Sequence, residues 1–250
     1  MPIKTALQEY PITNLKVSAY KVPTDYPEAD GTLSWNATTI VIAEATAGNR
    51  SGLGYTYAGK AAATFVDEVL AEVVKGRDAM DVPGTWRAMY RAVRNHGRAG
   101  IASTAISAVD VALWDLKARL LELPLVILLG TVREAIPIYG SGGFTSYSLE
   151  KLQKQLAGWA EAGIQRVKMK VGGNPDGDPN RVRAAREAIG PFISLFVDAN
   201  GAYTRKQALL MAEKFSRYNV EWFEEPVSSD DLKGLRLLRD HAPPIMDIAA

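Results

Sequence analysis

The chain has 250 residues, of which 47% are hydrophobic, a formal net charge of +1 and no cysteine. A net charge this close to zero gives no electrostatic reason to expect nucleic acid or an anionic membrane surface as a partner, and the lack of cysteine excludes disulfides and thiolate metal sites. The N-terminal residues lack the apolar run of a secretory leader. No apolar run reaches the ~20 residues that a membrane span needs, so we expect no such span. We expect a cytoplasmic protein of one or two domains.

The first part of the chain is predicted to be α+β. Residues 14–22 alternate between apolar and polar side chains like a half-buried strand, and residues 38–45 are rich in β-branched residues. The glycine-containing stretch 47–52 turns the chain into a further strand at 53–57, which predicts a hairpin or meander. Residues 23–35 are polar and rich in turn residues, so we expect an irregular loop that is disordered or forms a lid.

Three helices are expected next. Apolar residues recur at a spacing of three or four over 62–74, and similar patterns cover 85–95 and 103–121. Pro124 ends the third helix, because the residue before a proline disfavours helical geometry.

From residue 136 onward the pattern changes to a regular alternation of strands and helices. The expected strands are 136–139, 165–171, 195–199, 221–224 and 245–248. The expected helices are 148–162, 180–189, 205–218 and 231–241. Short connections between alternating strands and helices predict an α/β fold with a parallel sheet.

Either a barrel or an open doubly wound sheet satisfies this alternation. We favour the barrel because polar residues follow several successive strands, where (β/α)₈ enzymes carry their chemistry. Eight strands close such a barrel and only five are expected here, which leaves two unpaired parallel edges. We therefore expect that these residues are the front part of a longer protein, or that another element completes the barrel.

Charged residues stand at the ends of three successive expected strands. Lys168 and Lys170 end the second strand, Asp198 and Asn200 the third, and Glu224 the fourth. Successive strand residues point to opposite faces, so Lys168 and Lys170 share one face, as do Asp198 and Asn200. Asp198 and Glu224 supply the hard oxygen ligands that Mg²⁺ prefers, which predicts a magnesium site.

A base beside a divalent cation can remove a proton from carbon. The cation can bind a substrate carboxylate and stabilise the negative charge that appears when the neighbouring C–H bond loses its proton. Lys170 is the natural base, but an ordinary lysine has a pKa of about 10.4. A second ammonium group at Lys168, a nearby cation and partial burial would each lower the pKa of Lys170. Asn200 could donate a hydrogen bond to the substrate.

Each of these motifs also has a plain structural interpretation. A Lys-x-Lys pair alone usually marks a solvated strand face, and Glu-Glu-Pro usually marks a strand end before a turn. An Asp-x-Asn-Gly sequence is a common turn signal. The joint occurrence of all three, in order and on successive strands, favours a functional site.

These motifs, together with others along nearly the whole chain, resemble the mandelate racemase/muconate lactonizing enzyme group of the enolase superfamily. The matching segments are Ala105-Ile-Ser-Ala-Val-Asp110-Val-Ala-Leu-Trp114-Asp115, Leu129-Gly130, Tyr139-Gly-Ser141-Gly-Gly, Lys168-Met-Lys170, Val-Asp198-Ala-Asn200 and Trp-Phe-Glu224-Glu225-Pro226. The resemblance implies an α+β capping domain, here 1–133, followed by a (β/α)₇β barrel, of which 134–250 would form about the first half. It also implies Mg²⁺-assisted abstraction of the proton α to a carboxylate through an enolate intermediate.

The resemblance also implies roles for individual residues. Asp198 and Glu224 would be the first two metal ligands, and Lys170 would be the base on one face of the substrate, with Lys168 tuning it.

Two further residues would face the substrate. Asn200 would lie at or next to the metal ligands, and Ser141, at the end of the first barrel strand, would contact the substrate carboxylate. The third metal ligand and the acid/base of the opposite face would come from strands that follow Ala250.

The expected substrate is a small carboxylate, either a hydroxy acid or a sugar acid. We slightly favour a sugar acid dehydratase over a racemase, because the expected capping loops carry several polar side chains: Asp25, Glu28, Asp30, Ser34, Tyr55 and Tyr57. Two alternatives stay open, a cycloisomerase or epimerase of the muconate lactonizing type and a truncated, catalytically inert chain. We expect a homo-oligomer with no nucleic acid or membrane partner.

Overall fold

A computed structural model describes residues 9–250, which form two compact units. The first contains the N-terminal part up to Pro23 and Ala37–Glu134, and the second contains Thr24–Asn36 and Ala135–Ala250. The short segment Thr24–Asn36 thus belongs to the second unit although it lies far from Ala135–Ala250 in sequence.

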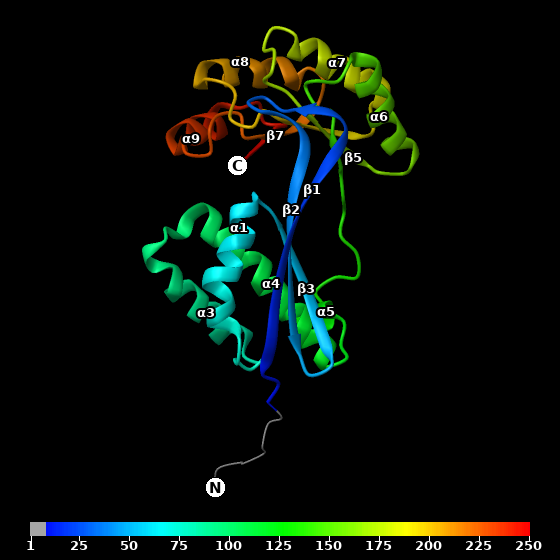
Figure 1. Cartoon of the computed structure of the whole chain (residues 1–250). Helices are drawn as coiled ribbons and strands as arrows, with labels where there is room; N and C mark the ends of the chain where they lie inside the picture. Colours follow the sequence, from blue (N-terminus) through cyan, green and yellow to red (C-terminus); the bar gives the residue numbers. More distant parts are fainter. Residues whose placement is uncertain (1–8) are drawn as a thin grey trace. The chain divides into compact units, whose positions relative to one another are not determined.

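The first unit contains a sheet of strands β1 (Ile12–Ala29), β2 (Ser34–Ala47) and β3 (Arg50–Tyr57), in that order (Figure 1). Strands β1 and β2 continue beyond this unit, so the expectation of an irregular loop at 23–35 is wrong. Pro23 and Pro27 suggested a break, but β1 is an edge strand, where a residue without an N–H group is tolerated. Only the turn between Asp30 and Leu33 separates the two strands, closed by a 3.0 Å hydrogen bond from Asp30 N to Leu33 O.

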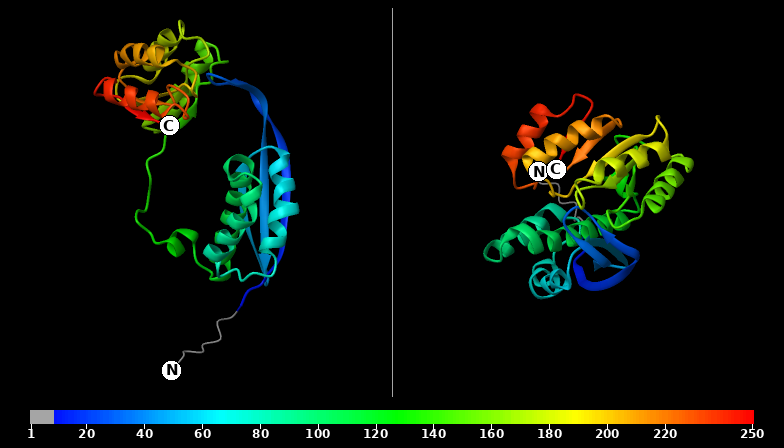
Figure 2. Two further views of the ribbon diagram at one scale, coloured as in Figure 1. Left: turned by 90° about the vertical axis from the view of Figure 1, so that its left-hand side faces the viewer. Right: turned by 90° about the horizontal axis from the view of Figure 1, so that it is seen from above.

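Helices cover one side of this sheet (Figure 2). The helical elements of this unit are α1 (Lys60–Phe65), the π-helical turn η1 (Val66–Leu70), α2 (Ala71–Val74), α3 (Val82–Ala92), the short η2 (Val93–Asn95) and η3 (Arg98–Ala102), α4 (Ser103–Leu120) and, after it, α5 (Leu125–Leu129). The three helices expected from the sequence are present, and the short α5 was not expected.

Helix α4 packs directly on β3. A Cβ atom on Gly52 would collide with the backbone of Ala112 and Leu116, and one on Gly54 with the backbone of Ala108. Glycine therefore permits the close approach of strand and helix. The segment Arg98–Leu120 is long and apolar enough to cross a membrane by length and composition, which differs from the expectation of no such segment. Its apolar residues, however, form much of the core of the first unit.

The second unit contains a parallel sheet of five strands in sequence order. They are β4 (Gly140–Gly142), β5 (Arg166–Lys170), β6 (Ser194–Asp198), β7 (Val220–Glu224) and β8 (Asp247–Ala249). The connecting helices α6 (Leu149–Glu161), α7 (Asp178–Ile189), α8 (Arg205–Ser216) and α9 (Leu232–His241) lie along one side of the strands (Figure 1). The expected α/β alternation is confirmed.

The first expected strand of this sheet was misplaced. Residues 136–139 form no strand, and Ile136 and Ile138 are 68% and 62% exposed. Pairing with β5 starts only at Gly140, opposite Val167. Apolar residues next to Pro137 imitated a strand, although they have no pairing partner.

Strand alternation divides β5, β6 and β7 into two faces. Val167, Met169, Val197 and Phe223 are fully buried in the core beneath the helices. The residues that alternate with them along the strands, among them Lys168, point to the opposite face. The hydrophobic core thereby fixes which residues are presented on the other side of the sheet.

Candidate active site

The register of the parallel strands brings the predicted charged residues into one row. Lys170 is opposite Asp198, and Asp198 is opposite Glu224, at the carboxyl ends of β5, β6 and β7. Lys168 lies one layer below and is opposite Ser141 of β4. A shift of one residue in either strand pairing would turn these side chains into the core, so the buried face sets the geometry of the row.

Two ammonium groups and two carboxylates form a connected network. Lys168 Nζ lies 2.6 Å from Glu224 Oε2 and 3.3 Å from Asp198 Oδ2, and Lys170 Nζ lies 2.5 Å from the same Asp198 oxygen. The side chains of Lys168 and Asp198 are only 7% and 2% exposed. Charges so poorly solvated interact much more strongly than they would on the surface.

Asn200 completes the network from the turn after β6. Its backbone is in the left-handed region, with φ of 49°, which Asn tolerates better than most residues. Its N–H donates to Asp198 Oδ1 at 2.9 Å, and its side-chain oxygen accepts a 3.0 Å hydrogen bond from Lys170 Nζ. Asn200 therefore holds both Asp198 and Lys170 in place, a contact that the sequence did not reveal.

Lys168 is a fixed positive charge beside Lys170. Burial lowers the pKa of Lys168. The hydrogen bond to Glu224 and the negative charges of Asp198 and Glu224 raise this pKa by more than burial lowers it, so the net pKa lies above the ordinary value of a lysine. Its ammonium form is thus favoured at neutral pH.

An aromatic row lies one layer beneath the carboxylates. The rings of Tyr139 and Phe196 are 5.7 Å apart, and those of Phe196 and Trp222 are 6.0 Å apart. Lys168 Nζ lies 5.3 Å from the centre of the Tyr139 ring, and Trp222 Nε1 donates to Glu224 Oε2 at 3.3 Å. These aromatic residues were not predicted as site residues, although Phe196 and Trp222 stand two positions before Asp198 and Glu224, the spacing that shares a strand face.

Ser141 stands apart from the charged network. It is exposed in β4, and none of the hydrogen bonds found among residues 9–250 joins it to the lysines or carboxylates. Its position opposite Lys168 nevertheless places it on the same strand layer.

The two predicted carboxylate ligands account for part of the coordination shell of a divalent cation. Asp198 and Glu224 offer carboxylate oxygens, which are suitable Mg²⁺ ligands. Within residues 9–250 no group of three or more His, Asp or Glu side chains converges. The two carboxylates would therefore need water, substrate oxygens or a further ligand to complete a coordination shell.

Comparisons with known proteins identify the family. The model of the mandelate racemase/muconate lactonizing enzyme N-terminal domain matches residues 16–130, and the model described as enolase C-terminal domain-like matches residues 151–250. A mandelate racemase/muconate lactonizing enzyme-like protein from Rubrobacter xylanophilus is 58% identical, with a TM-score of 0.94, over 96% of this chain and 67% of that chain. The chain belongs to the mandelate racemase/muconate lactonizing enzyme group of the enolase superfamily.

Other members of the group differ in the reaction that their names give. The 3,6-anhydro-alpha-L-galactonate cycloisomerase of Streptomyces coelicolor is 35% identical over 92% of this chain and 66% of its own length. The L-talarate/galactarate dehydratase of Salmonella typhimurium, solved with Mg and L-lyxarohydroxamate, is 30% identical with a TM-score of 0.89, over 100% of this chain and 67% of that one. The chain spans about half to two thirds of the length of the curated relatives that it matches.

Family membership decides the fold of the second unit. Its five parallel strands and four helices are part of an enolase-type barrel, and the antiparallel sheet of the first unit is the capping sheet. The doubly wound alternative is thereby excluded.

Another buried carboxylate supports the loops of this enolase-type site. Asp178 is fully buried at the start of α7, where its Oδ2 accepts hydrogen bonds from Tyr203 Oη at 2.5 Å and Gly172 N at 2.8 Å. These bonds connect the loop after Lys170 with the loop after Asp198. Asp178 was not predicted as a site residue, because Asp-Pro within a turn-rich stretch is an ordinary loop and helix-start signal.

The protonation of Asp178 is expected to affect stability. Burial raises its pKa, although the hydrogen bonds from Tyr203 and Gly172 and the charge of Arg181 lower it, and the net pKa lies above the ordinary value of an aspartate. The unfolded chain therefore loses this proton at lower pH than the folded chain. The contribution of Asp178 to stability consequently falls as the pH rises from the unfolded pKa through the folded pKa.

We predict that Asp178→Asn removes this contribution to the pH dependence. Asparagine can keep both acceptor bonds through its single side-chain oxygen without placing a negative charge in the core. Urea unfolding at a series of pH values, from acidic to neutral, gives the free energy of unfolding. This free energy should change less with pH in Asp178→Asn than in the native chain, whereas the exposed-site control Asp67→Asn should keep the native pH dependence. An unchanged slope in Asp178→Asn would contradict the assignment.

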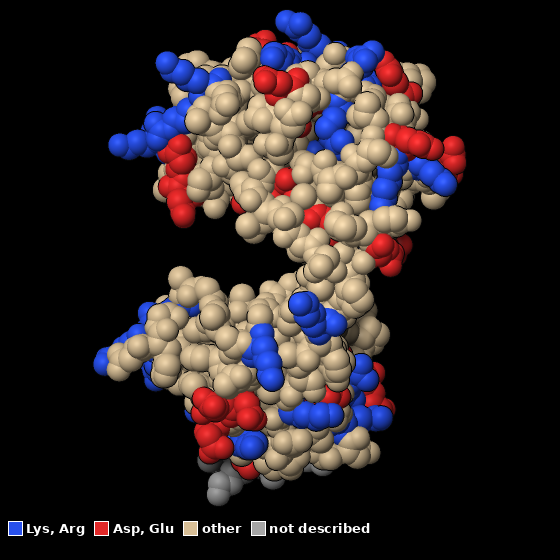
Figure 3. All heavy atoms as spheres, turned by 45° about the horizontal axis from the view of Figure 1, so that its top comes forward, with Lys and Arg blue, Asp and Glu red and all other residues tan. Residues whose placement is uncertain are grey.

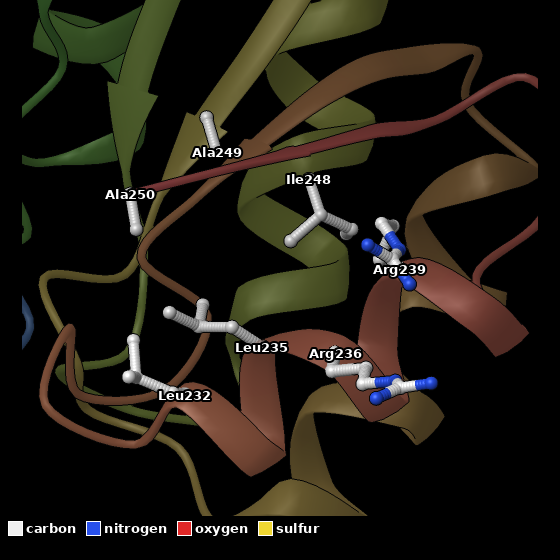
Figure 4. Close-up of a pocket in the computed structure, with 7 residues that line it drawn as sticks. All are labelled: Leu232, Leu235, Arg236, Arg239, Ile248, Ala249 and Ala250. Carbon is white, nitrogen blue, oxygen red and sulfur yellow. The ribbon is translucent and has the colours of Figure 1, made fainter.

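A cavity of about 520 Å³ lies elsewhere, between α9 and β8 (Figure 4). Leu235 and Ile248 form its apolar part, and Arg236 and Arg239 border it from α9. None of the lysines or carboxylates of the network lines this cavity, so its volume does not identify the site.

On the face shown in Figure 3, positive and negative side chains are intermixed, without a continuous patch of one sign.

Proposed function

We propose that this chain takes part in Mg²⁺-dependent abstraction of the proton α to a carboxylate, through an enolate intermediate, in a sugar acid dehydratase reaction. The observation that carries the proposal is the network of Lys168, Lys170, Asp198 and Glu224 at the aligned ends of three neighbouring strands. Paired lysines and hard carboxylates at the same edge of an enolase-type barrel suit carbon acid chemistry.

We assign Asp198 and Glu224 as two of the magnesium ligands. When bound, Mg²⁺ would supply positive charge for the substrate carboxylate and for the negative charge that develops beside it. The oxygens that would bind the cation now accept hydrogen bonds from Lys168 and Lys170. Positive charge at this position is therefore already favoured by the surrounding chain.

We assign Lys170 as the base, with its Nζ taking the proton from the substrate carbon. Asn200 orients Lys170 through the bond to its side-chain oxygen. Lys168, whose Nζ donates to Glu224 Oε2, is proposed to act on Lys170 as a neighbouring positive charge. Ser141, on the neighbouring strand, is proposed to contact the substrate carboxylate.

The preference for a sugar acid, first based on polar residues of the expected capping loops, is now based on the names of the relatives. Asp30 Oδ1 accepts hydrogen bonds from its own turn, and Glu28 Oε2 accepts one from Trp35, so these polar side chains are partly engaged within the hairpin. The names of the relatives instead favour a sugar acid, because the Salmonella protein is an L-talarate/galactarate dehydratase. A cycloisomerase is the second candidate, since the Streptomyces relative carries that name at 35% identity.

Other expectations from the sequence stay predictions. We propose a capping domain at 1–133 and a barrel domain at 134–250, a cytoplasmic location and a homo-oligomer. An inert chain is the opposing hypothesis, and metal binding is the first property that separates it from the enzyme.

We predict that the chain binds Mg²⁺ and that Asp198→Asn and Glu224→Gln each weaken binding by about tenfold or more, because each removes one charged ligand. Isothermal titration calorimetry with Mg²⁺ measures this directly. Asp240→Asn, an exposed carboxylate site on α9, is the matched control and should bind like the native chain. Native affinity in both site variants would refute the ligand assignment.

A further inference from the structure

Asp178 and Arg181 lie in the first turn of α7, and residues three positions apart are neighbours on a helix. Asp178 is fully buried, and Asp178 Oδ1 and Arg181 Nε are buried atoms without a hydrogen-bond partner among residues 9–250. Burial lowers the pKa of Arg181, and the charge of Asp178 raises it in part. Neither charge is well solvated, so each compensates the other.

Arg181 holds the loop after β4, residues 143–147. Its Nη1 donates to Tyr147 O at 2.8 Å, and its Nη2 donates to Phe144 O at 2.9 Å. Phe144 follows Gly143, whose carbonyl oxygen accepts a 3.1 Å hydrogen bond from Lys170 N. The guanidinium group therefore fixes a loop that is bonded to the backbone of the assigned base.

Asp178 holds the loop after β5, residues 171–177. Its Oδ2 accepts the 2.8 Å hydrogen bond from Gly172 N, two residues after Lys170. Gly172 has a φ of 97°, in the left-handed region that favours glycine. A Cβ atom at Gly172 would lie 2.6 Å from the Cβ atom of Ala202. The bond to Asp178 therefore closes a crowded turn directly after the strand that carries Lys170.

The same carboxylate oxygen reaches the loop after β6, residues 199–204. Tyr203 Oη donates to Asp178 Oδ2 at 2.5 Å, and Tyr203 is only 4% exposed. Burial and the negative charge of Asp178 raise the pKa of Tyr203, so its hydroxyl group keeps the proton that it donates. One turn of α7 thus connects the three loops that follow β4, β5 and β6.

We propose that Asp178 and Arg181 are positioning residues that fix the end of β5, and with it Lys170, from both sides. The inference rests on the proposed function, because the position of Lys170 matters to catalysis only if Lys170 is the base. Asp198 and Glu224 are placed by the register of β6 and β7. Loss of the pair should therefore slow proton removal more than it weakens Mg²⁺ binding, because a slightly displaced base is much less effective.

Arg186, also on α7, offers a matched control at the opposite end of the strands. Its guanidinium group donates to four backbone carbonyl oxygens, those of Gly190, Ile193, Tyr218 and Asn219. These carbonyl groups precede β6 and β7, so they lie at the amino ends of the strands. Arg186→Met should destabilise the fold at least as much as Arg181→Met, without disturbing the loops at the carboxyl ends.

Hydrogen–deuterium exchange measured by mass spectrometry tests the role of the pair without reference to activity. In Arg181→Met we expect the amides of 143–147 to exchange at least about tenfold faster, because hydrogen bonds from a charged donor are lost. Asp178→Ala should have this effect on 171–177 and 199–204, and the milder Tyr203→Phe should have it on 199–204. Arg186→Met should leave all three loops at native rates. Native rates in 143–147 of Arg181→Met, or in 199–204 of Tyr203→Phe, would overturn the proposal.

Proton exchange and calorimetry test the consequence for catalysis. With saturating galactarate and Mg²⁺, Arg181→Met should exchange the substrate α-proton at least about tenfold more slowly, while its affinity for Mg²⁺ stays native. Arg181→Lys keeps the charge and a donor and should recover part of the rate, whereas Arg186→Met should keep the native rate.

Two results would overturn the positioning role. One is an equal loss of rate in Arg181→Met and Arg186→Met, which would reduce the effect to general stability. The other is a native rate in an Arg181→Met chain whose 143–147 loop exchanges faster. If the native chain neither binds Mg²⁺ nor exchanges the α-proton, the proposed function fails, while the amide exchange data still decide whether the pair holds the loops.

Discussion

Replacing Lys170 with methionine is expected to slow exchange of the substrate α-proton by about 10²–10⁴-fold, the usual contribution of a positioned base. Methionine keeps the length of the side chain but has no nitrogen to accept the proton. Lys170 is the natural candidate because its Nζ lies at the carboxyl end of β5, within 2.5 Å of Asp198 Oδ2 and 3.0 Å of Asn200 Oδ1. The measurement is ¹H NMR of galactarate in deuterated solvent with Mg²⁺.

The control for this experiment is Lys154→Met, which removes an exposed lysine of α6 and should exchange the proton at the native rate. Mg²⁺ titration of the Lys170 variant shows whether the carboxylates still bind the cation. Exchange of the substrate α-proton at the native rate in a Lys170→Met chain that still binds Mg²⁺ would contradict the assignment of Lys170 as the base.

The second large effect concerns stability and involves Lys168. Lys168→Met leaves Asp198 and Glu224 without their shared partner, and breaking a buried ion pair by removing one member costs about 3–5 kcal/mol of unfolding free energy. Because Glu224 is 28% exposed, we expect the lower end of that range, about 3 kcal/mol. A divalent cation bound by the same two carboxylates would supply the missing positive charge and stabilise the folded state.

Urea unfolding with and without saturating Mg²⁺ measures this effect. The loss of stability in Lys168→Met should be largest without Mg²⁺ and should shrink when Mg²⁺ is present, whereas Lys206→Met, at an exposed position of α8, should change little in either condition. An equal loss with and without Mg²⁺ would mean that Lys168 and the cation do not share the carboxylates.

The sequence predicted the charged row well because strand periodicity is simple. Lys168, Lys170, Asp198 and Glu224 end apolar runs, and the buried faces of those runs fix which side chains share the other face. The parallel register then aligns the strand ends without any information beyond the order of the elements.

Contacts between segments distant in sequence were not predictable in this way. The tip of the β1–β2 hairpin looked like a loop because Pro23, Pro27 and polar residues dominate it, yet Ala29 O accepts a hydrogen bond from Thr145 Oγ1, 116 residues away. Asp178 was not singled out from the sequence, although it joins two loops through Tyr203 and Gly172. Such contacts arise from the packing of whole elements and leave no periodic signal in the local sequence.

The proposed step is removal of the proton α to a carboxylate. In our proposal Lys170 takes the proton from one face of the substrate, and the cation held by Asp198 and Glu224 would stabilise the negative charge that develops. The names of the relatives include both dehydratase and cycloisomerase, so proton removal alone would not distinguish the two proposed reactions. Comparing galactarate with a sugar lactone as exchange substrates would separate the two proposed activities.

The position of a bound cation would show whether Asp198 and Glu224 hold it. Crystals of the chain grown with Mn²⁺ in place of Mg²⁺ would give an anomalous difference peak at the ion. We predict a peak within about 2.0–2.3 Å of carboxylate oxygens of both Asp198 and Glu224, with the lysine ammonium groups displaced from those oxygens. A peak elsewhere, with Lys168 and Lys170 still bonded to both carboxylates, would contradict it.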